Sequence, residues 1–118
     1  MAKVKDLMSK HIVGVSTETT VDSAMRLAKS MHVNLIPVIS DGRLEGVALQ
    51  KDFEAADGKD KVKKVMHEPL FVESDNSAEQ AAKLMVENAV GRLPVVDSKK
   101  GMRCVGIISS TDIVKSAK

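Results

Sequence analysis

The stretch RLPVVDSKKGMRCVGIISSTD, residues 92–112, decides the fold, because LIPVISDGRLEGVALQKD at residues 35–52 already carries the same pattern. Both stretches contain an apolar-Pro-Val run, and both end on an aspartate six residues after a Gly-apolar step. The pattern extends outward, since Val-Lys-x-x-Met occurs at residues 4–8 and again at residues 62–66. A tandem repeat of this length indicates one structural unit that has been copied once.

The register of the two copies is kept in detail. From Val15 to the proline the offset is 57 residues, and after it the offset is 60, so the second copy has three extra residues within the polar turn 97–103. Such a turn tolerates insertions at little cost. We therefore expect repeats at 1–57 and 58–118, packed as one compact module, because 118 residues can bury one core but not several.

Composition excludes several function classes. The formal net charge is only +2 with both signs mixed along the chain, which makes a nucleic-acid role unlikely. Phe53 and Phe71 are the only aromatic residues, so the core must be aliphatic and no stacking platform for bases is available. Cys104 is the single cysteine, which excludes an intrachain disulfide, and we expect it to be a small buried apolar residue.

The sequence gives no support for catalysis, metal binding or insertion into a membrane. The three histidines have no metal-ligand spacing, and no catalytic triad or carboxylate pair can be argued, so we assign no catalytic and no metal-binding residue. No apolar run approaches the roughly 18 residues of a membrane span, and the N-terminus has no signal-peptide core. We expect a cytoplasmic, non-enzymatic protein without a membrane partner.

Each copy predicts the order strand, helix, strand, strand, helix. Short β-prone runs at 12–15 and 70–72 precede polar stretches, and Thr19 and Asn76 each stand three residues before an acidic residue, as in a capping box. Apolar positions then follow helical spacing at Val21, Ala24, Met25, Ala28, Met31 and at Ala78, Ala81, Ala82, Met85, Ala89, which we interpret as core. Further strands are predicted at 35–39, 44–49, 93–96 and 104–108. Short helices are predicted to begin at 51–52 and at 111–112, and residues 54–61 link the two copies.

The whole pattern from Val4 to Lys115 resembles the cystathionine β-synthase (CBS) domain family, as a tandem pair of CBS domains, also called a Bateman module. Its markers are Met8 and Met66, the two apolar-Pro-Val segments, and a Gly-apolar-x-Ser/Thr-x-x-Asp signature that is complete at residues 106–112. The resemblance implies a mixed α/β (α+β) fold of two β-α-β-β-α repeats, packed through their sheets with pseudo-twofold symmetry around two clefts. Such pairs are regulatory modules for AMP, ADP, ATP or S-adenosylmethionine, often acting on an enzyme or transporter, and they imply no covalent cofactor.

The second repeat carries the stronger candidate site. Ser109 and Asp112 stand where a strand turns into a helix, so the carboxylate can accept both ribose hydroxyls while Ser109 and Thr111 donate to ribose or phosphate oxygens. The alternative is that Ser109 and Asp112 only cap the last helix. Arg92, directly before the Leu-Pro step, matches the position where related nucleotide binders carry a basic residue for phosphate, and its alternative is a solvated surface charge.

The base would need an apolar slot, for which the candidates are Pro69, Leu70 and Ile108. His67 is a further candidate beside the ligand, with an exposed surface histidine as the alternative. The first repeat keeps Asp52 but replaces Ser109 by Leu49 and Arg92 by Leu35, so we expect a degenerate second site in which Asp52 caps its helix.

Three functions of different classes follow. The leading one is a sensor of an adenosine derivative, and the first alternative is a ligand-independent interaction module whose CBS pair only dimerises. The last alternative is a nucleic-acid-binding accessory, which the small basic excess disfavours. A homodimer is expected in each case, since the family pairs through its helices and the Ala- and Met-rich stripes would permit close approach.

Overall fold

The structure, a computed structural model, describes residues 2–116 and divides into two compact units. Unit 1 combines the residues up to Ile12 with those from Phe71 onward, and unit 2 is Val13–Leu70. The mixed α/β fold is confirmed, while the packing of two repeats through their sheets stays a prediction.

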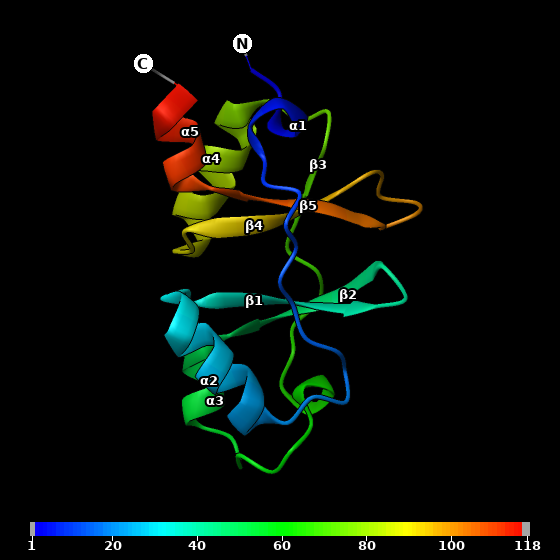
Figure 1. Cartoon of the computed structure of the whole chain (residues 1–118), viewed down its shortest axis with the longest axis vertical. Helices are drawn as coiled ribbons and strands as arrows, with labels where there is room; N and C mark the ends of the chain where they lie inside the picture. Colours follow the sequence, from blue (N-terminus) through cyan, green and yellow to red (C-terminus); the bar gives the residue numbers. More distant parts are fainter. Residues whose placement is uncertain (1, 117–118) are drawn as a thin grey trace. The chain divides into compact units, whose positions relative to one another are not determined.

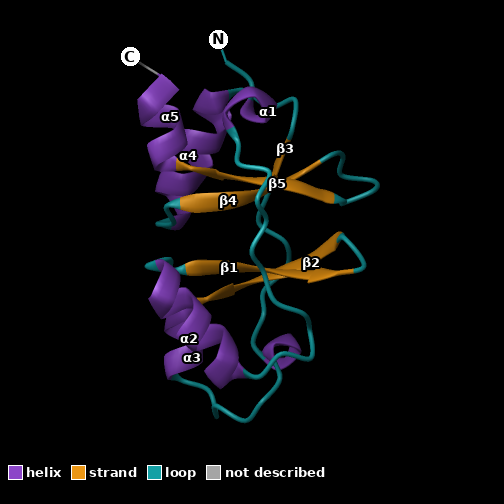
Figure 2. Cartoon of the chain, viewed as in Figure 1, coloured by secondary structure: helices purple, strands orange, loops and turns teal. Residues whose placement is uncertain are grey.

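Unit 2 is an antiparallel strand pair with helices on one face (Figures 1 and 2). Its elements are α2 (Val21–Met31), β1 (Leu35–Ser40), β2 (Arg43–Leu49), α3 (Gln50–Glu54) and the 3-10 helix η1 (Val62–Lys64). Every second strand residue points at the helices, so Ile36 and Ala48 join the buried face of α2 and Phe53 in one aliphatic core.

Unit 1 repeats this plan with one more strand (Figure 1). Its elements are α1 (Val4–Leu7), β3 (Val72–Glu73), α4 (Ala78–Asn88), β4 (Arg92–Val96), β5 (Cys104–Ser109) and α5 (Ser110–Ser116). Strand β3 runs parallel to β4, and β4 pairs antiparallel with β5. The β3–α4–β4 connection explains the parallel pair, because a crossover helix returns the chain to the same end of the sheet.

Residues 4–9 and 62–67, which we call the leading segments, are exchanged between the repeats. Ser9 forms an antiparallel bridge with Ile107 of the second repeat, and His67 forms the corresponding bridge with Val47 of the first. Each leading segment therefore belongs to one repeat in the sequence and packs with the other repeat in the structure. For this reason the compact units do not follow the sequence repeats 1–57 and 58–118.

The crossing of these segments explains the glycine in the Gly-apolar signature. A Cβ on Gly106 would lie 2.6 Å from Met8 Sδ and 2.8 Å from the Ser9 carbonyl oxygen. A Cβ on Gly46 would collide with the His67 carbonyl oxygen and lie 3.2 Å from the sulfur of Met66. Both glycines are needed because a second backbone passes over them, and the two methionines fill the space beside that contact.

Three local predictions were wrong by small margins. Helix α2 is capped by Thr20, whose hydroxyl accepts a hydrogen bond from the Ser23 amide, and helix α4 is capped by Ser77 in a capping box. Each cap lies one residue after the predicted one. The Thr19 hydroxyl instead accepts from the Ser16 amide, and Asn76 Oδ1 accepts from the Glu73 amide, because short polar side chains also close turns. Residues 12–15 form a single parallel bridge, between Val15 and Val38 of β1, rather than a strand.

The helical stripes are confirmed as core at six of their ten positions, while Met25, Met31 and Ala82 are partly buried and Ala89 is exposed. A dimer contact through the stripes stays a prediction. The buried stripe residues are Val21, Ala24 and Ala28 on α2, and Ala78, Ala81 and Met85 on α4. Among the described residues the exposed large apolar side chains are instead Val86 and Val114, at 81% and 63% exposure.

Cys104 is buried as predicted, and burial raises the pKa of its thiol, which keeps it in the unreactive protonated form. No helix within the described chain is both long and apolar enough to cross a bilayer.

Candidate functional site

Arg92 and Ser109 are direct partners across β4 and β5. Directly opposed residues of an antiparallel pair project from the same face of the sheet, so the guanidinium and the hydroxyl share one face. Both residues are partly buried. The register of the sheet therefore places a cation and a hydroxyl next to each other in the second repeat.

Asp112 is joined to Ser109 by two reciprocal hydrogen bonds. The Ser109 amide donates to Asp112 Oδ2 at 2.9 Å, and the Asp112 amide donates to Ser109 Oγ at 3.2 Å. The capping alternative is thus a real feature of the α5 start. Both side chains can still bind a ligand, because the Ser109 hydroxyl can donate its own proton and the second oxygen of the Asp112 carboxylate can accept further hydrogen bonds. Thr111 is exposed beside them.

Ile108 does not share this face. It pairs with Leu93, and both are fully buried, one step along the strands from Arg92 and Ser109. Successive strand residues point to opposite faces, so Ile108 points away from the Ser109 side chain. Ile107 is the apolar residue of β5 on the Ser109 face, and Ser9 lies directly opposite it. Sequence reasoning missed both, although counting back two residues from Ser109 identifies Ile107.

His67, Pro69 and Leu70 belong to unit 2, whereas Ser109, Thr111, Asp112 and Arg92 belong to unit 1. The structure brings His67 together with Asp52, because His67 Nε2 lies 2.6 Å from Asp52 Oδ2. Leu35 and Leu49 are direct partners across β1 and β2, at the same register position as Arg92 and Ser109. The two leucines therefore occupy, in the first repeat, the positions that Arg92 and Ser109 occupy in the second, while the degenerate character of the first site stays a prediction.

Asp52 does not cap its helix in the predicted way. The N-cap of α3 is Leu49, which has no side chain capable of capping, and the hydrogen bond recorded for the Asp52 carboxylate goes to His67. The reciprocal arrangement of Ser109 and Asp112 cannot form here because leucine offers no hydroxyl.

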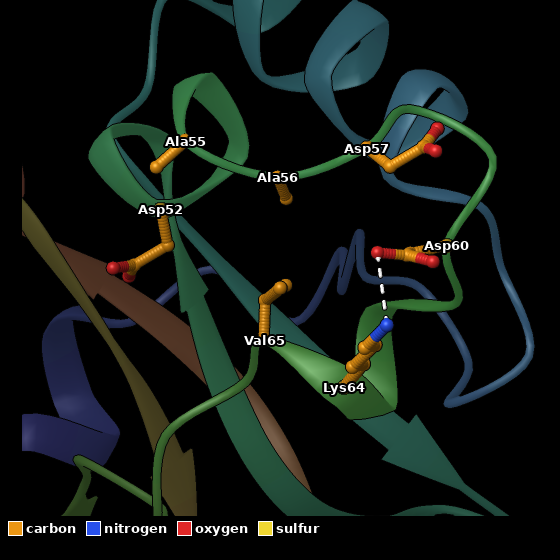
Figure 3. Close-up of a pocket in the computed structure, with 7 residues that line it drawn as sticks. All are labelled: Asp52, Ala55, Ala56, Asp57, Asp60, Lys64 and Val65. Atoms are coloured by element: carbon orange, nitrogen blue, oxygen red, sulfur yellow. Dashed lines mark ion pairs between the residues drawn. The ribbon is translucent and has the colours of Figure 1, made fainter.

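A cavity of about 380 Å³ lies in unit 2 and includes Asp52 in its wall (Figure 3). Figure 3 shows the Asp52 carboxylate turned away from Asp57 and Asp60, and Asp60 pairs with Lys64 at 3.4 Å. The remaining lining residues are Ala55, Ala56 and Val65. In the described part of the chain no group of histidine, cysteine and carboxylate side chains could hold a metal ion.

A second cavity, of about 330 Å³, lies in unit 1 and is lined mainly by apolar residues of α4 and α5. Its wall includes the exposed Val86 and Val114, together with Ala82, Met85, Ala89, Val90, Ser110 and Ile113. We call this the α4–α5 groove. It contains none of the predicted ligand-binding residues.

The family model of the CBS domain matches the chain twice, at residues 4–57 and 62–118. The CBS domain-containing protein YhcV of Bacillus subtilis is 34% identical over 96% of this chain and 84% of its own length. The uncharacterized protein MJ0188 of Methanocaldococcus jannaschii is 32% identical over 97% of this chain, but the chain spans only 43% of that protein.

Solved structures give the same fold. CBSX2 in complex with AMP superimposes with a TM-score of 0.83 at 32% identity, covering 99% of this chain and 96% of that one. The cytosolic domain of the Mg²⁺ channel MgtE in complex with ATP gives a TM-score of 0.78 at 30% identity, covering 97% of this chain and 48% of that one.

Proposed function

The chain belongs to the CBS domain family, with two CBS repeats in tandem, and we propose that it is a non-catalytic regulatory module that binds an adenosine-containing ligand. The proposed site, which we call the Asp112 site, consists of Arg92, Ser109, Thr111 and Asp112. The ligand class is AMP, ADP, ATP or S-adenosylmethionine.

One observation carries the proposal: Arg92 and Ser109 face each other on one side of the sheet, and Asp112 is hydrogen-bonded to Ser109. A carboxylate with spare acceptor capacity suits the vicinal hydroxyls of a ribose. A guanidinium a short distance away suits a phosphate, because its fork of donors matches two phosphate oxygens. Ribose and phosphate partners are thereby supplied by one strand pair and the first turn of the helix that follows it.

The similarity to nucleotide complexes supports the ligand class. CBSX2 was solved with AMP and the cytosolic domain of MgtE with ATP, both at 30% identity or more to this chain. AMP and ATP share the adenosine and phosphate groups for which Asp112 and Arg92 are suited. We therefore rank phosphorylated adenosine derivatives above S-adenosylmethionine.

The first repeat is proposed as the weaker site. The equivalents of Arg92 and Ser109 are Leu35 and Leu49, which offer neither charge nor hydrogen-bond donors to a phosphate. Asp52 alone remains for a ribose. The proposed function therefore rests on the second repeat.

The alternative function is a ligand-independent interaction module that dimerises. The α4–α5 groove favours it, because Val86 and Val114 are among the most exposed apolar side chains described and stand in the wall of an apolar cavity. We propose that this groove is the homodimer contact in both alternatives. A regulated enzyme or transporter remains the proposed further partner, and we place the module in the cytoplasm without a nucleic-acid partner.

Thermal unfolding in the presence of AMP, ATP or S-adenosylmethionine tests the function. A ligand at about 100 times its Kd should stabilise the folded chain by about 2.7 kcal/mol. For a chain of this size that corresponds to a rise in Tm of roughly 10 °C. If none of the three shifts the Tm while the chain is still a dimer, the interaction module would be the better account.

A further inference from the structure

The hydrogen bond between His67 and Asp52 has no counterpart in the other repeat. His67 Nε2 lies 2.6 Å from Asp52 Oδ2, and the two side chains are 50% and 26% exposed. The bonds recorded for Asp112 instead join it to Ser109, within its own turn. One of two equivalent aspartates is thus bonded to a side chain that comes from a distant part of the sequence.

The backbone around the two aspartates is equivalent, so the difference comes from side chains: Leu49 stands in place of Ser109, and His67 stands in place of Ser9. Ser9 and Ile107 exchange two backbone hydrogen bonds of 2.9 Å, and His67 and Val47 exchange two of 3.1 and 2.8 Å. Each aspartate stands five residues after the bridged strand residue. Ser9 therefore occupies the same backbone position toward Asp112 that His67 occupies toward Asp52.

Side-chain length decides what happens at that position. The imidazole of His67 reaches the carboxylate, whereas the hydroxyl of Ser9 is too short to do so and accepts from the amide of His11 at 3.1 Å. The Nε2–H of His67 donates to an oxygen that a ribose hydroxyl would otherwise use. A nucleoside at Asp52 would have to break this bond before it could make its own.

We propose that the hydrogen bond from His67 to the Asp52 carboxylate blocks the binding of a nucleoside at the first repeat. Each chain is thereby limited to one ligand, at the Asp112 site. The proposal rests on the proposed function, since it takes the aspartate of each repeat as the ribose partner. In this proposal His67 determines how many ligand molecules one chain binds. The bond that a nucleoside must displace is a hydrogen bond to a charged acceptor. We therefore expect His67 to weaken nucleoside binding at Asp52 about tenfold to a hundredfold.

Exchange of the two side chains tests the proposal. His67→Ser gives the first repeat the residue that the second repeat has at this position, and Ser9→His does the reverse. Both side chains are exposed and both backbone bridges are retained, so each variant is expected to fold. The probe is adenosine, since Leu35 and Leu49 offer nothing to a phosphate, and the readout is the number of adenosine molecules bound per chain in titration calorimetry.

The wild-type chain should bind one adenosine, and His67→Ser should bind two. The additional site should disappear when Asp52→Ala is added to His67→Ser, which shows where it lies. Ser9→His should keep a single site but weaken it about tenfold to a hundredfold, because the new imidazole can reach Asp112.

The outcomes separate this proposal from the function on which it rests. A stoichiometry of one for both the wild type and His67→Ser would overturn the role of His67 and leave the Asp112 site intact. Two wild-type sites of equal affinity would overturn it as well, because the first-repeat site should be about tenfold to a hundredfold weaker than in His67→Ser. If wild type and both variants bound neither adenosine nor AMP, the proposed function would fall, and the role of His67 with it.

Discussion

Replacement of Asp112 by alanine should abolish most ligand binding, whereas the same change at Asp52 should not. Two ribose hydroxyls donating to one carboxylate form two hydrogen bonds to a charged acceptor, each worth about 1.5–3 kcal/mol. Their loss amounts to about 3–6 kcal/mol, or roughly two to four orders of magnitude in Kd. For Asp52→Ala we expect no more than about 0.5 kcal/mol, a factor of roughly two, because His67 already holds that carboxylate.

A structural effect must be separated from the loss of the ligand contact. Asp112→Ala also removes the acceptor for the Ser109 amide at 2.9 Å, and the loss of such a cap costs about 0.5–2 kcal/mol of folding stability. Asp112→Asn is the matched control, because its side-chain oxygen can still accept from that amide while the charge is gone. We expect Asp112→Asn to unfold close to the wild-type temperature but to bind AMP more weakly.

The assay is titration calorimetry with AMP on the wild type, Asp112→Ala, Asp112→Asn and Asp52→Ala, with circular dichroism to show that each variant is folded. Equal losses of affinity at the two aspartates would refute the asymmetry between the repeats. Wild-type affinity in a folded Asp112→Ala chain would refute the assignment of the ribose contact.

Arg92→Leu should weaken AMP by about 1.5–3 kcal/mol but leave adenosine almost unchanged, because the guanidinium is assigned to phosphate; equal losses for both ligands in calorimetry would contradict that role. Gly106→Ala should destabilise the chain by about 1–3 kcal/mol in urea unfolding, since its Cβ would lie 2.6 Å from a sulfur of the leading segment, whereas Gly91→Ala, with no atom within 4 Å, serves as the control. Ala89→Gly should raise stability by about 0.5–1 kcal/mol by the same measurement, because Ala89 ends α4 with a left-handed φ of 54°; a drop in the urea midpoint would speak against this strain. Light scattering should report about twice the 12.7 kDa chain mass for the wild type and a monomer for Val86→Asp, which places a charge in the α4–α5 groove; a monomeric wild type would remove the dimer from the proposal.

Local sequence patterns predicted much of unit 1 and unit 2 correctly. The strands after each helix, the aliphatic core and the equivalence of Arg92 with Leu35 all follow from the repeat and its periodicity. The caps were missed by one residue, because Thr19 and Thr20, like Asn76 and Ser77, are neighbours with similar propensities. Only the turn geometry, with Ser16 and Glu73 as partners, decides which of the two caps the helix.

The sequence predicted which residue types form the candidate site, but it predicted only in part which of these residues lie on the same face of the sheet. The sequence alone determined that the second repeat carries a cation and a hydroxyl where the first repeat carries two leucines. That Arg92 and Ser109 oppose each other was decided by the register of β4 and β5. Ile108 was misjudged because residues adjacent in sequence on a strand face opposite ways. The repeat itself, its core positions and the weaker chemistry of the first copy were likewise determined by the sequence.

Tertiary structure alone decided the exchange of the leading segments, and with it the partner of Asp52. His67 lies within the second repeat of the sequence, yet it pairs with Val47 of the first repeat and donates to the carboxylate fifteen residues before it. Propensity and periodicity describe a segment and its immediate neighbours, whereas this contact depends on which sheet edge the segment reaches when the chain folds back. The glycine at each crossing is visible in the sequence, but its reason, a second backbone too close for any Cβ, exists only in the folded chain.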